Sequence, residues 1–106
     1  MSIVQATIDR DSYHEGYTWV LTPGDQSSTV EVYANNGMSV QVVNGKYIPD
    51  GIDVLVSNDG NNWVTISALG PNSISEIAEN FHRYYRFQNP ASGWNATVIL
   101  FRRLVR

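Results

Sequence analysis

The side chains best suited to chemistry in this sequence are two histidines, His14 and His82, and ten acidic residues. The densest group of potential metal ligands is Asp9, Asp11, His14 and Glu15, whose spacing matches no known metal motif and is typical of a polar loop between strands. A covalent nucleophile is not indicated, because there is no cysteine and no G-x-S-x-G segment. The pattern therefore predicts no catalytic residue, no metal site and no cofactor, and we expect a protein that is not an enzyme.

The tryptophans carry more information than the ionisable residues. Trp63 follows the segment SNDGNN at 57–62, which has the oxygen ligands of a calcium loop but lacks its alternating acids and distal glutamate, so we interpret it as a tight turn. Exposed indole rings pack on the flat faces of sugars, which makes Trp63 and Trp94 the candidates for a glycan-stacking platform. The alternative is that the tryptophans, Trp19 included, are buried in the core or against a neighbouring subunit.

Apolar residues recur mostly with a period of two, which is typical of β-strands. The strands expected on this basis cover 2–8, 16–22, 28–34, 38–43, 52–57, 63–67, 83–88 and 95–105. In the remaining stretch, 71–82, apolar residues have helical spacing and Ser73 and Glu76 stand as in a capping box, so we expect a short helical turn near 73–80 or an irregular loop. Together these predict an all-β chain with one domain, 1–106, a small antiparallel β-sandwich of jelly-roll or immunoglobulin-like type.

Two turns predict hairpins in this sandwich. Asn35-Asn36-Gly37 is expected to join 28–34 to 38–43, and the turn at 57–62 is expected to join 52–57 to 63–67. In the second hairpin the apolar residues at 52, 54, 56, 64 and 66 are expected to face the core. This arrangement leaves Trp63 facing outward.

Charge is sparse in this sequence. Charged residues make up 16% of the chain, against roughly 25% in typical domains, and the net charge is −3 with a single lysine, Lys46. No basic stripe could neutralise a run of phosphates, so nucleic acid is not expected as a partner. No apolar run approaches the roughly 20 residues that cross a bilayer, and the N-terminal pattern is not that of a secretory signal, so neither a membrane partner nor secretion is expected.

The last apolar segment indicates a protein partner. Val98 and Leu100 would lie on one face of this strand, with Ile99 and Phe101 on the other, and a two-layer sandwich covers only one of these faces. Ile99 and Phe101, together with the outward-facing Trp63, are therefore candidates for contacts with another polypeptide, whereas the three arginines at the end of the sequence are interpreted as a solvated terminus.

Four segments occur in a recognisable order: SVQV at 39–42, SNDGNNWVTI at 57–66, RYYRF at 83–87 and TVILFRR at 97–103. This order resembles that of small β-rich virion structural proteins of tailed bacteriophages. The resemblance implies a capsid decoration, or cement, protein that is made in a host cytoplasm and resides in the virion. It further implies a homo-oligomer, with a trimer favoured, that stabilises the head shell by bridging copies of the major capsid protein or another virion protein. The residues that it implies for contacts between subunits or with the shell are Trp63, Ile99, Phe101, Arg102, Arg103 and Arg106.

The S-N-D-G-x-x-W piece is shared with carbohydrate-binding sandwiches. The alternative expectation is therefore a carbohydrate-binding module of a phage fibre, a tail or a bacterial surface protein. In that case Trp63 and Trp94 would stack on the glycan.

Overall fold

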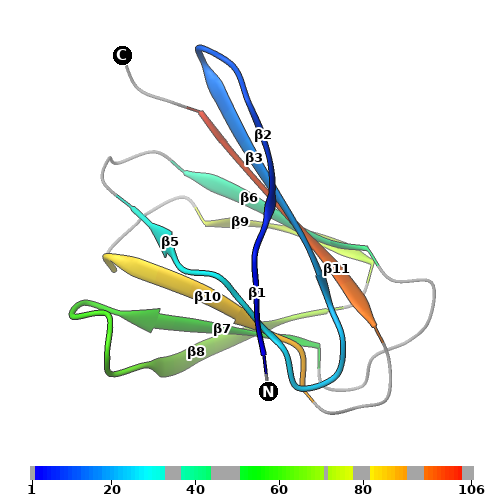
Figure 1. Cartoon of the computed structure of the whole chain (residues 1–106), viewed down its shortest axis with the longest axis vertical. Coiled ribbons are helices and arrows are strands. Elements are labelled where there is room, and N and C mark those ends of the chain that lie inside the picture. The colour runs from blue at the N-terminus through cyan, green and yellow to red at the C-terminus, as the bar shows by residue number, and fades with distance from the viewer. Residues whose placement is uncertain are drawn as a thin grey trace.

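The computed structural model describes residues 2–32, 37–43, 51–70, 72–77, 82–90 and 95–103. These residues form eleven strands and no helix, and the strands build two sheets that pack against each other (Figure 1). The small, largely antiparallel β-sandwich expected from the period-two pattern is therefore confirmed.

The first sheet has six strands and the second has five. Across the first sheet the order is β1 (Ile3–Val4), β4 (Gln26–Ser27), β10 (Tyr84–Gln88), β7 (Ile52–Ser57) and β8 (Val64–Leu69), and β5 (Val30–Glu31) also pairs with β10. Across the second sheet the order is β2 (Thr7–Arg10), β3 (His14–Leu21), β11 (Ala96–Arg103), β6 (Met38–Val43) and β9 (Ser73–Ile77). Neighbouring strands in these sheets run antiparallel, except β1 beside β4.

The chain changes sheet on both sides of the sandwich. β1 and β2 are consecutive in sequence but lie at the edges of different sheets, and the same is true of β8 and β9. The strand at the centre of the second sheet is β11, which pairs along its whole length with β3 and for most of it with β6. Side chains on either face of β11 are therefore flanked by strands on both sides.

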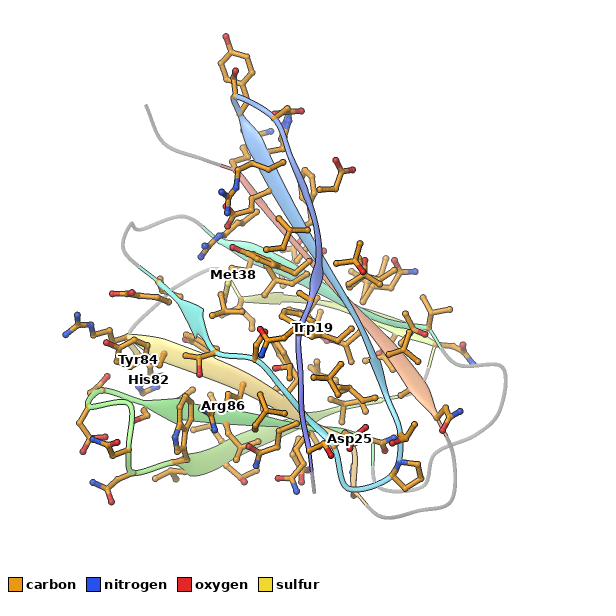
Figure 2. The ribbon with its side chains drawn as sticks, in the orientation of Figure 1. Trp19, Asp25, Met38, His82, Tyr84 and Arg86 are labelled. Atoms are coloured by element: carbon orange, nitrogen blue, oxygen red, sulfur yellow. The ribbon has the colours of Figure 1, made fainter. Side chains whose placement is uncertain are left out.

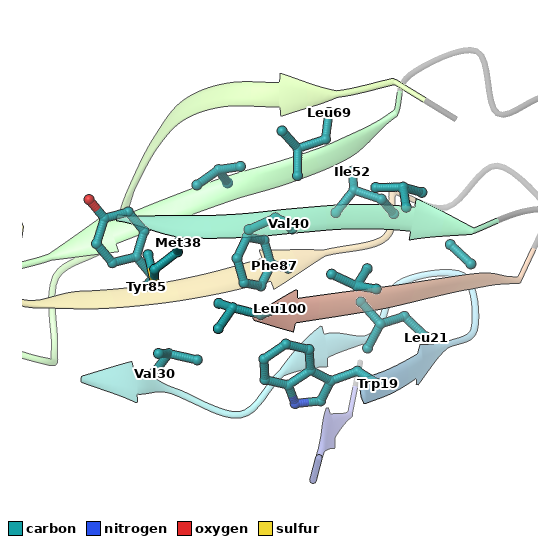
Figure 3. Close-up of a cluster of buried hydrophobic side chains, with 14 of the residues drawn as sticks. Trp19, Leu21, Val30, Met38, Val40, Ile52, Leu69, Tyr85, Phe87 and Leu100 are labelled. Atoms are coloured by element: carbon teal, nitrogen blue, oxygen red, sulfur yellow. The ribbon is translucent and has the colours of Figure 1, made fainter. Parts of the chain in front are cut away.

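The core lies between the two sheets and is filled by large side chains from both (Figure 3). Trp19 of β3 and Phe87 of β10 meet across it, with ring centroids 5.7 Å apart. Trp19, Phe87 and Tyr85 are each at most 1% exposed. Because side chains alternate between the two faces of a strand, the same strands turn every second residue away from this core.

The hairpin of β7 and β8 is confirmed, and its turn is the one predicted at 57–62. Asp59 organises the turn, because its Oδ1 accepts hydrogen bonds from the backbone N–H groups of Asn61 and Asn62 at 2.8 Å each and from the Ser57 hydroxyl at 2.9 Å. Gly60 adopts a φ of +80°, a conformation that glycine reaches without steric cost. The oxygens that resemble calcium ligands thus serve the turn itself.

Residues 73–77 form a strand, so the helical turn expected near 73–80 is wrong for this part. β9 pairs with β6 from Ser73 opposite Val42 to Ile77 opposite Met38, and its side chains alternate between half-buried and exposed. Pairing with a neighbouring strand supplies the backbone hydrogen bonds, and this tertiary contribution outweighs the helical spacing of the apolar residues. Residues 78–80 lie outside the described residues.

The hairpin expected around Asn35-Asn36-Gly37 is also wrong. β5 pairs with β10 in the first sheet, whereas β6 pairs with β11 and β9 in the second. The connection between them therefore crosses from one sheet to the other. Asn35 and Asn36 lie outside the described residues.

Val64 and Ile66 do not face the core as expected, since they are 63% and 49% exposed. β8 lies at the edge of its sheet, and a bulge places Val54 opposite Ser67 but Leu55 opposite Thr65, which leaves Ile66 as the extra residue. The remaining apolar residues of this hairpin, at 52, 54 and 56, are buried as expected.

Candidate functional site

A cluster of charged side chains is buried on the inner face of the second sheet. Glu15 of β3 lies opposite Arg102 of β11, and the two residues are 1% and 7% exposed. Arg102 donates to Glu15 Oε1 from Nε at 2.9 Å and from Nη2 at 2.7 Å, and the Tyr17 hydroxyl donates to the same oxygen. Arg10 reaches Oε2 at 2.5 Å, so both carboxylate oxygens are engaged.

The surroundings of Glu15 favour its ionised form. Burial by itself raises the pKa of Glu15, but hydrogen bonds from Tyr17 and Arg102 and the charges of Arg102 and Arg10 outweigh burial, so the pKa lies below its ordinary value. Burial and the hydrogen bond to Glu15 raise the pKa of Tyr17. A carboxylate held ionised by two guanidinium groups is not poised to accept a proton at neutral pH.

This charged cluster joins the two sheets. Arg102 Nη1 donates to the backbone oxygen of Glu31 at 3.0 Å, and Glu31 belongs to β5 of the first sheet. The position predicted for Arg102, on a contact surface, is therefore not the one observed, because its guanidinium is turned inward and bonded within the chain. The cluster acts as a structural link.

The acidic segment around residues 9–15 is organised as a turn. Asp11 Oδ1 accepts hydrogen bonds from the backbone N–H groups of Tyr13 at 2.7 Å and His14 at 2.8 Å. Over the described ranges, no group of three or more histidine, aspartate or glutamate side chains is placed to hold a metal ion. The described part of the chain contains no helix long and apolar enough to cross a membrane.

The outer face of the second sheet carries exposed apolar side chains from four of its five strands. On β11, Ile99 is half-buried and Phe101 is 47% exposed. The strand register places these residues on one face with Val20 of β3, Val43 of β6 and Ile74 of β9, which are 57%, 43% and 64% exposed. We call these five residues the outer apolar face.

Phe101 has a defined position within the outer apolar face. It lies opposite Gly16 of β3, which has no side chain to crowd it, and its ring stacks on His14 with centroids 5.3 Å apart. Charged side chains lie at the perimeter of the same face: Asp9 on β2, Glu76 on β9 and Arg103 at the end of β11. An apolar centre with a charged rim of both signs is the usual arrangement of a protein–protein contact surface.

Trp63 lies on the other side of the molecule. Its ring packs beneath the guanidinium of Arg86, 4.4 Å from the ring centroid. Arg86 belongs to β10 of the first sheet (Figure 2). Arg86 also donates to Thr29 Oγ1 at 2.9 Å and to Gln26 Oε1 at 3.3 Å. Trp63 is therefore half-buried by its own chain on the outer side of the first sheet, away from the outer apolar face.

The structure brings only some of the predicted contact residues together. Ile99 and Phe101 share the outer apolar face, and Arg103 lies at its perimeter. Trp63 lies on the other sheet and Arg102 in the interior, while Trp94 and Arg106 fall outside the described residues.

Three members of the outer apolar face were not predicted from the sequence. Val20 could have been found, because it alternates with Trp19 and Leu21 along the predicted strand 16–22. Ile74 was missed because its segment was not expected to be a strand. Val43 is the last residue of β6, and only the sheet register shows that it lies beside Thr97.

The sequence matches no protein-family model, and no curated protein matches it, but solved structures share its architecture. A cupin domain from Bordetella pertussis superposes with a TM-score of 0.57 at 17% identity, covering 94% of this chain and 92% of that one. The chain has a cupin-like fold. At this level of identity the cupin likeness establishes the fold alone.

Other cupin domains agree with this assignment of the fold. The cupin domain of an XRE family transcriptional regulator from Enterobacter cloacae gives a TM-score of 0.53 at 19% identity, over 88% of this chain and 83% of that one. The cupin domain of Schizosaccharomyces pombe Cnp3 gives 0.53 at 12% identity, over 94% of this chain and 59% of that one.

The cupin-like fold overturns the relationship to phage virion proteins. Structural neighbours are cupin domains, and neither a capsid decoration protein nor the alternative carbohydrate-binding module is supported. The misleading resemblance is explained by the segment 57–66. Its Ser, Asn, Asp and Gly residues meet the needs of the β7–β8 turn, and unrelated β-sandwiches solve the same problem with the same residues.

Proposed function

We propose that this chain is a non-enzymatic association domain of cupin-like fold, which pairs with a second copy of itself through the outer apolar face. The observation that carries the proposal is the position of Ile99 and Phe101. They lie on the strand at the centre of the sheet, where neighbouring strands on both sides contribute further exposed apolar side chains. Large exposed apolar patches on folded domains commonly mark contact sites.

The interior supports a non-catalytic role. Trp19, Tyr85 and Phe87 occupy the space between the sheets, and the most deeply buried carboxylate among the described residues, that of Glu15, is bonded to arginines. The cupin domain of the transcriptional regulator is an example in which this fold forms one domain of a regulatory protein.

The chemistry of the rim favours a second copy as the partner. Asp9 and Glu76 lie on the two edge strands, and Arg103 lies at one end of the face, so two copies related by a two-fold axis can place opposite charges together. The face measures about 26 Å along β11 and roughly 20 Å across five strands, which approaches the area that each partner contributes to a small specific interface. The trimer was expected from the phage resemblance, and with that resemblance gone we propose a two-fold pairing.

The test is a substitution at the centre of the face. Phe101→Asp places a charge where a second copy would have to desolvate it, and we expect the dissociation constant for pairing through this face to rise about 30-fold or more, the ~2 kcal/mol typical of a central contact residue. The wild type should sediment at a mass at least twice the 11.9 kDa of one chain, and the variant at no more than half the wild-type mass.

The control is Tyr13→Asp, which changes an aromatic side chain that is 66% exposed at the β2–β3 turn, outside the outer apolar face. This variant should keep the wild-type mass. A wild-type protein that remains a monomer at all concentrations, or a Phe101→Asp variant with unchanged mass, would overturn the proposed function.

A further inference from the structure

Five strands of the described residues pair on one side only, and these edge strands differ in how they are protected. A free edge offers unpaired backbone N–H and C=O groups to any extended chain, and folded proteins usually blunt it with charges or short length. β1 and β5 are each two residues long, β2 carries Asp9 and Arg10, and β9 carries Glu76. β8 has neither kind of protection.

β8 is the longest edge strand, with the sequence VTISAL, and it contains no charged residue and no proline. Five of its six residues are exposed, and Val64 and Ile66 are 63% and 49% exposed. Over the described residues it pairs only with β7. Roughly half of its backbone hydrogen-bonding groups therefore point away from the sheet.

The bulge at Ile66 bends this edge without removing it. Val64 and Thr65 pair with β7 on one side of the bulge, and the residues from Ser67 to Leu69 pair on the other. A bulge interrupts the ladder for one residue, so a strand that joins this edge must tolerate one unpaired position opposite Ile66.

We propose that β8 pairs antiparallel with β8 of a second copy about a two-fold axis at Ile66, so that the two bulged residues lie opposite each other and the first sheets of two copies form one continuous sheet. This contact lies on the other sheet from the outer apolar face and does not depend on it. Across a two-fold axis the residues of β8 meet residues of the identical strand. A charge at or next to this axis would therefore lie near the same charge of the second copy, whereas this strand offers β-branched and hydroxyl side chains, which form favourable cross-strand pairs.

A chain with both contacts forms assemblies larger than a dimer, and the two contacts can be separated by mutation. In the Phe101→Asp background, which weakens the outer apolar face, we expect a dimer held by β8. Adding Ile66→Lys to that background should place two lysines together at the axis and yield a monomer. An equimolar mixture of chains with Ile66→Lys and chains with Ile66→Glu, each also carrying Phe101→Asp, should dimerise again, because opposite charges then face each other.

The matched control is Ile8→Lys, which adds the same charge at a residue that is 53% exposed on the charged edge strand β2. In the Phe101→Asp background, Ile8→Lys should leave the dimer mass measured by sedimentation equilibrium unchanged. Circular dichroism should show that each variant keeps its β-sheet signal.

Each remaining outcome separates the two proposals. If Phe101→Asp alone gives a monomer, the β8 contact is overturned and the outer apolar face stands. If Phe101→Asp changes nothing while Ile66→Lys abolishes association, the outer apolar face is overturned and β8 stands. A failure of the Lys and Glu mixture to dimerise would overturn pairing between two β8 strands, as would capture of an unrelated extended peptide by this edge while the chain itself stays monomeric.

Discussion

At the scale of the residue, Asp59 shows how one side chain can organise a turn and suggest a false relationship. Its carboxylate accepts hydrogen bonds from two backbone N–H groups, from the Ser57 hydroxyl and from the side-chain amide of Asn62 at 2.7 Å. Hydrogen bonds from the backbone N–H groups of Asn62 and Asn61 have the largest effect on this carboxylate, and those from the side chains of Asn62 and Ser57 add to it. Together they hold the pKa of Asp59 well below its ordinary range. The motif that resembled a phage protein is explained by this local chemistry.

Replacing Asp59 tests the role of its charge in the turn. Because the folded-state pKa is lowered, the stability that Asp59 contributes is complete above the ordinary aspartate pKa of about 4 and is lost as the pH falls toward the lowered value. We expect Asp59→Asn to unfold at lower temperature than the wild type at neutral pH, and Asp59→Ala at a lower temperature still. The gap between wild type and Asp59→Asn should close in acid, and a gap independent of pH would contradict this role.

At the scale of the element, the start of β7 depends on a glycine. Gly51 has a φ of +69°, and a Cβ atom at this position would lie 2.4 Å from the backbone oxygen of Leu69. Leu69 pairs with Ile52 at the end of the β7–β8 ladder, so a side chain at position 51 would push the two strands apart.

Gly51→Ala should therefore lower the free energy of unfolding by roughly 3 kcal/mol. This loss adds the energetic cost of holding alanine in a left-handed conformation to that of the clash between its Cβ and the backbone. The control is Gly24→Ala, at a φ of +86° with no atom within 4 Å of the added Cβ. That variant should lose only the conformational part, about 1 kcal/mol. Urea unfolding of both proteins measures the difference, and equal losses would show that no clash occurs.

At the scale of the whole molecule, the buried charged cluster connects the two sheets through Arg102. Glu15→Ala leaves the guanidinium of Arg102 buried without its carboxylate, and we expect a loss of about 3–5 kcal/mol in the free energy of unfolding. The paired replacement Glu15→Leu with Arg102→Met should recover most of it, since it leaves no buried charge without a partner and the half-exposed Arg10 side chain can turn to water. If the paired replacement is as unstable as Glu15→Ala, the loss does not arise from the unmatched charge.

The pH dependence of stability should carry the same signature. The pKa of Glu15 is lowered in the folded state, so its contribution is complete above the ordinary glutamate pKa of about 4.3 and declines as the pH falls toward the lowered value. Below about pH 4, the free energy of unfolding should therefore fall less steeply with decreasing pH in the paired replacement than in the wild type.

Most strand positions, the hairpin at 57–62 and the class of the fold could be predicted from the sequence. These are local properties, because alternating side chains and turn residues depend only on neighbours in the chain. The sequence also placed Ile99 and Phe101 correctly on the face of the last strand opposite Val98 and Leu100.

Which strands are neighbours could be learned only from the three-dimensional structure. A strand takes its hydrogen bonds from partners distant in the sequence, so β5 and β6 went to different sheets and residues 73–77 became a strand beside β6. Val64 and Ile66 are exposed because β8 lies at the edge of its sheet. Arg102 points into the interior because it bonds to Glu15 there. No local pattern contains these facts, because each depends on how two sheets close around one core.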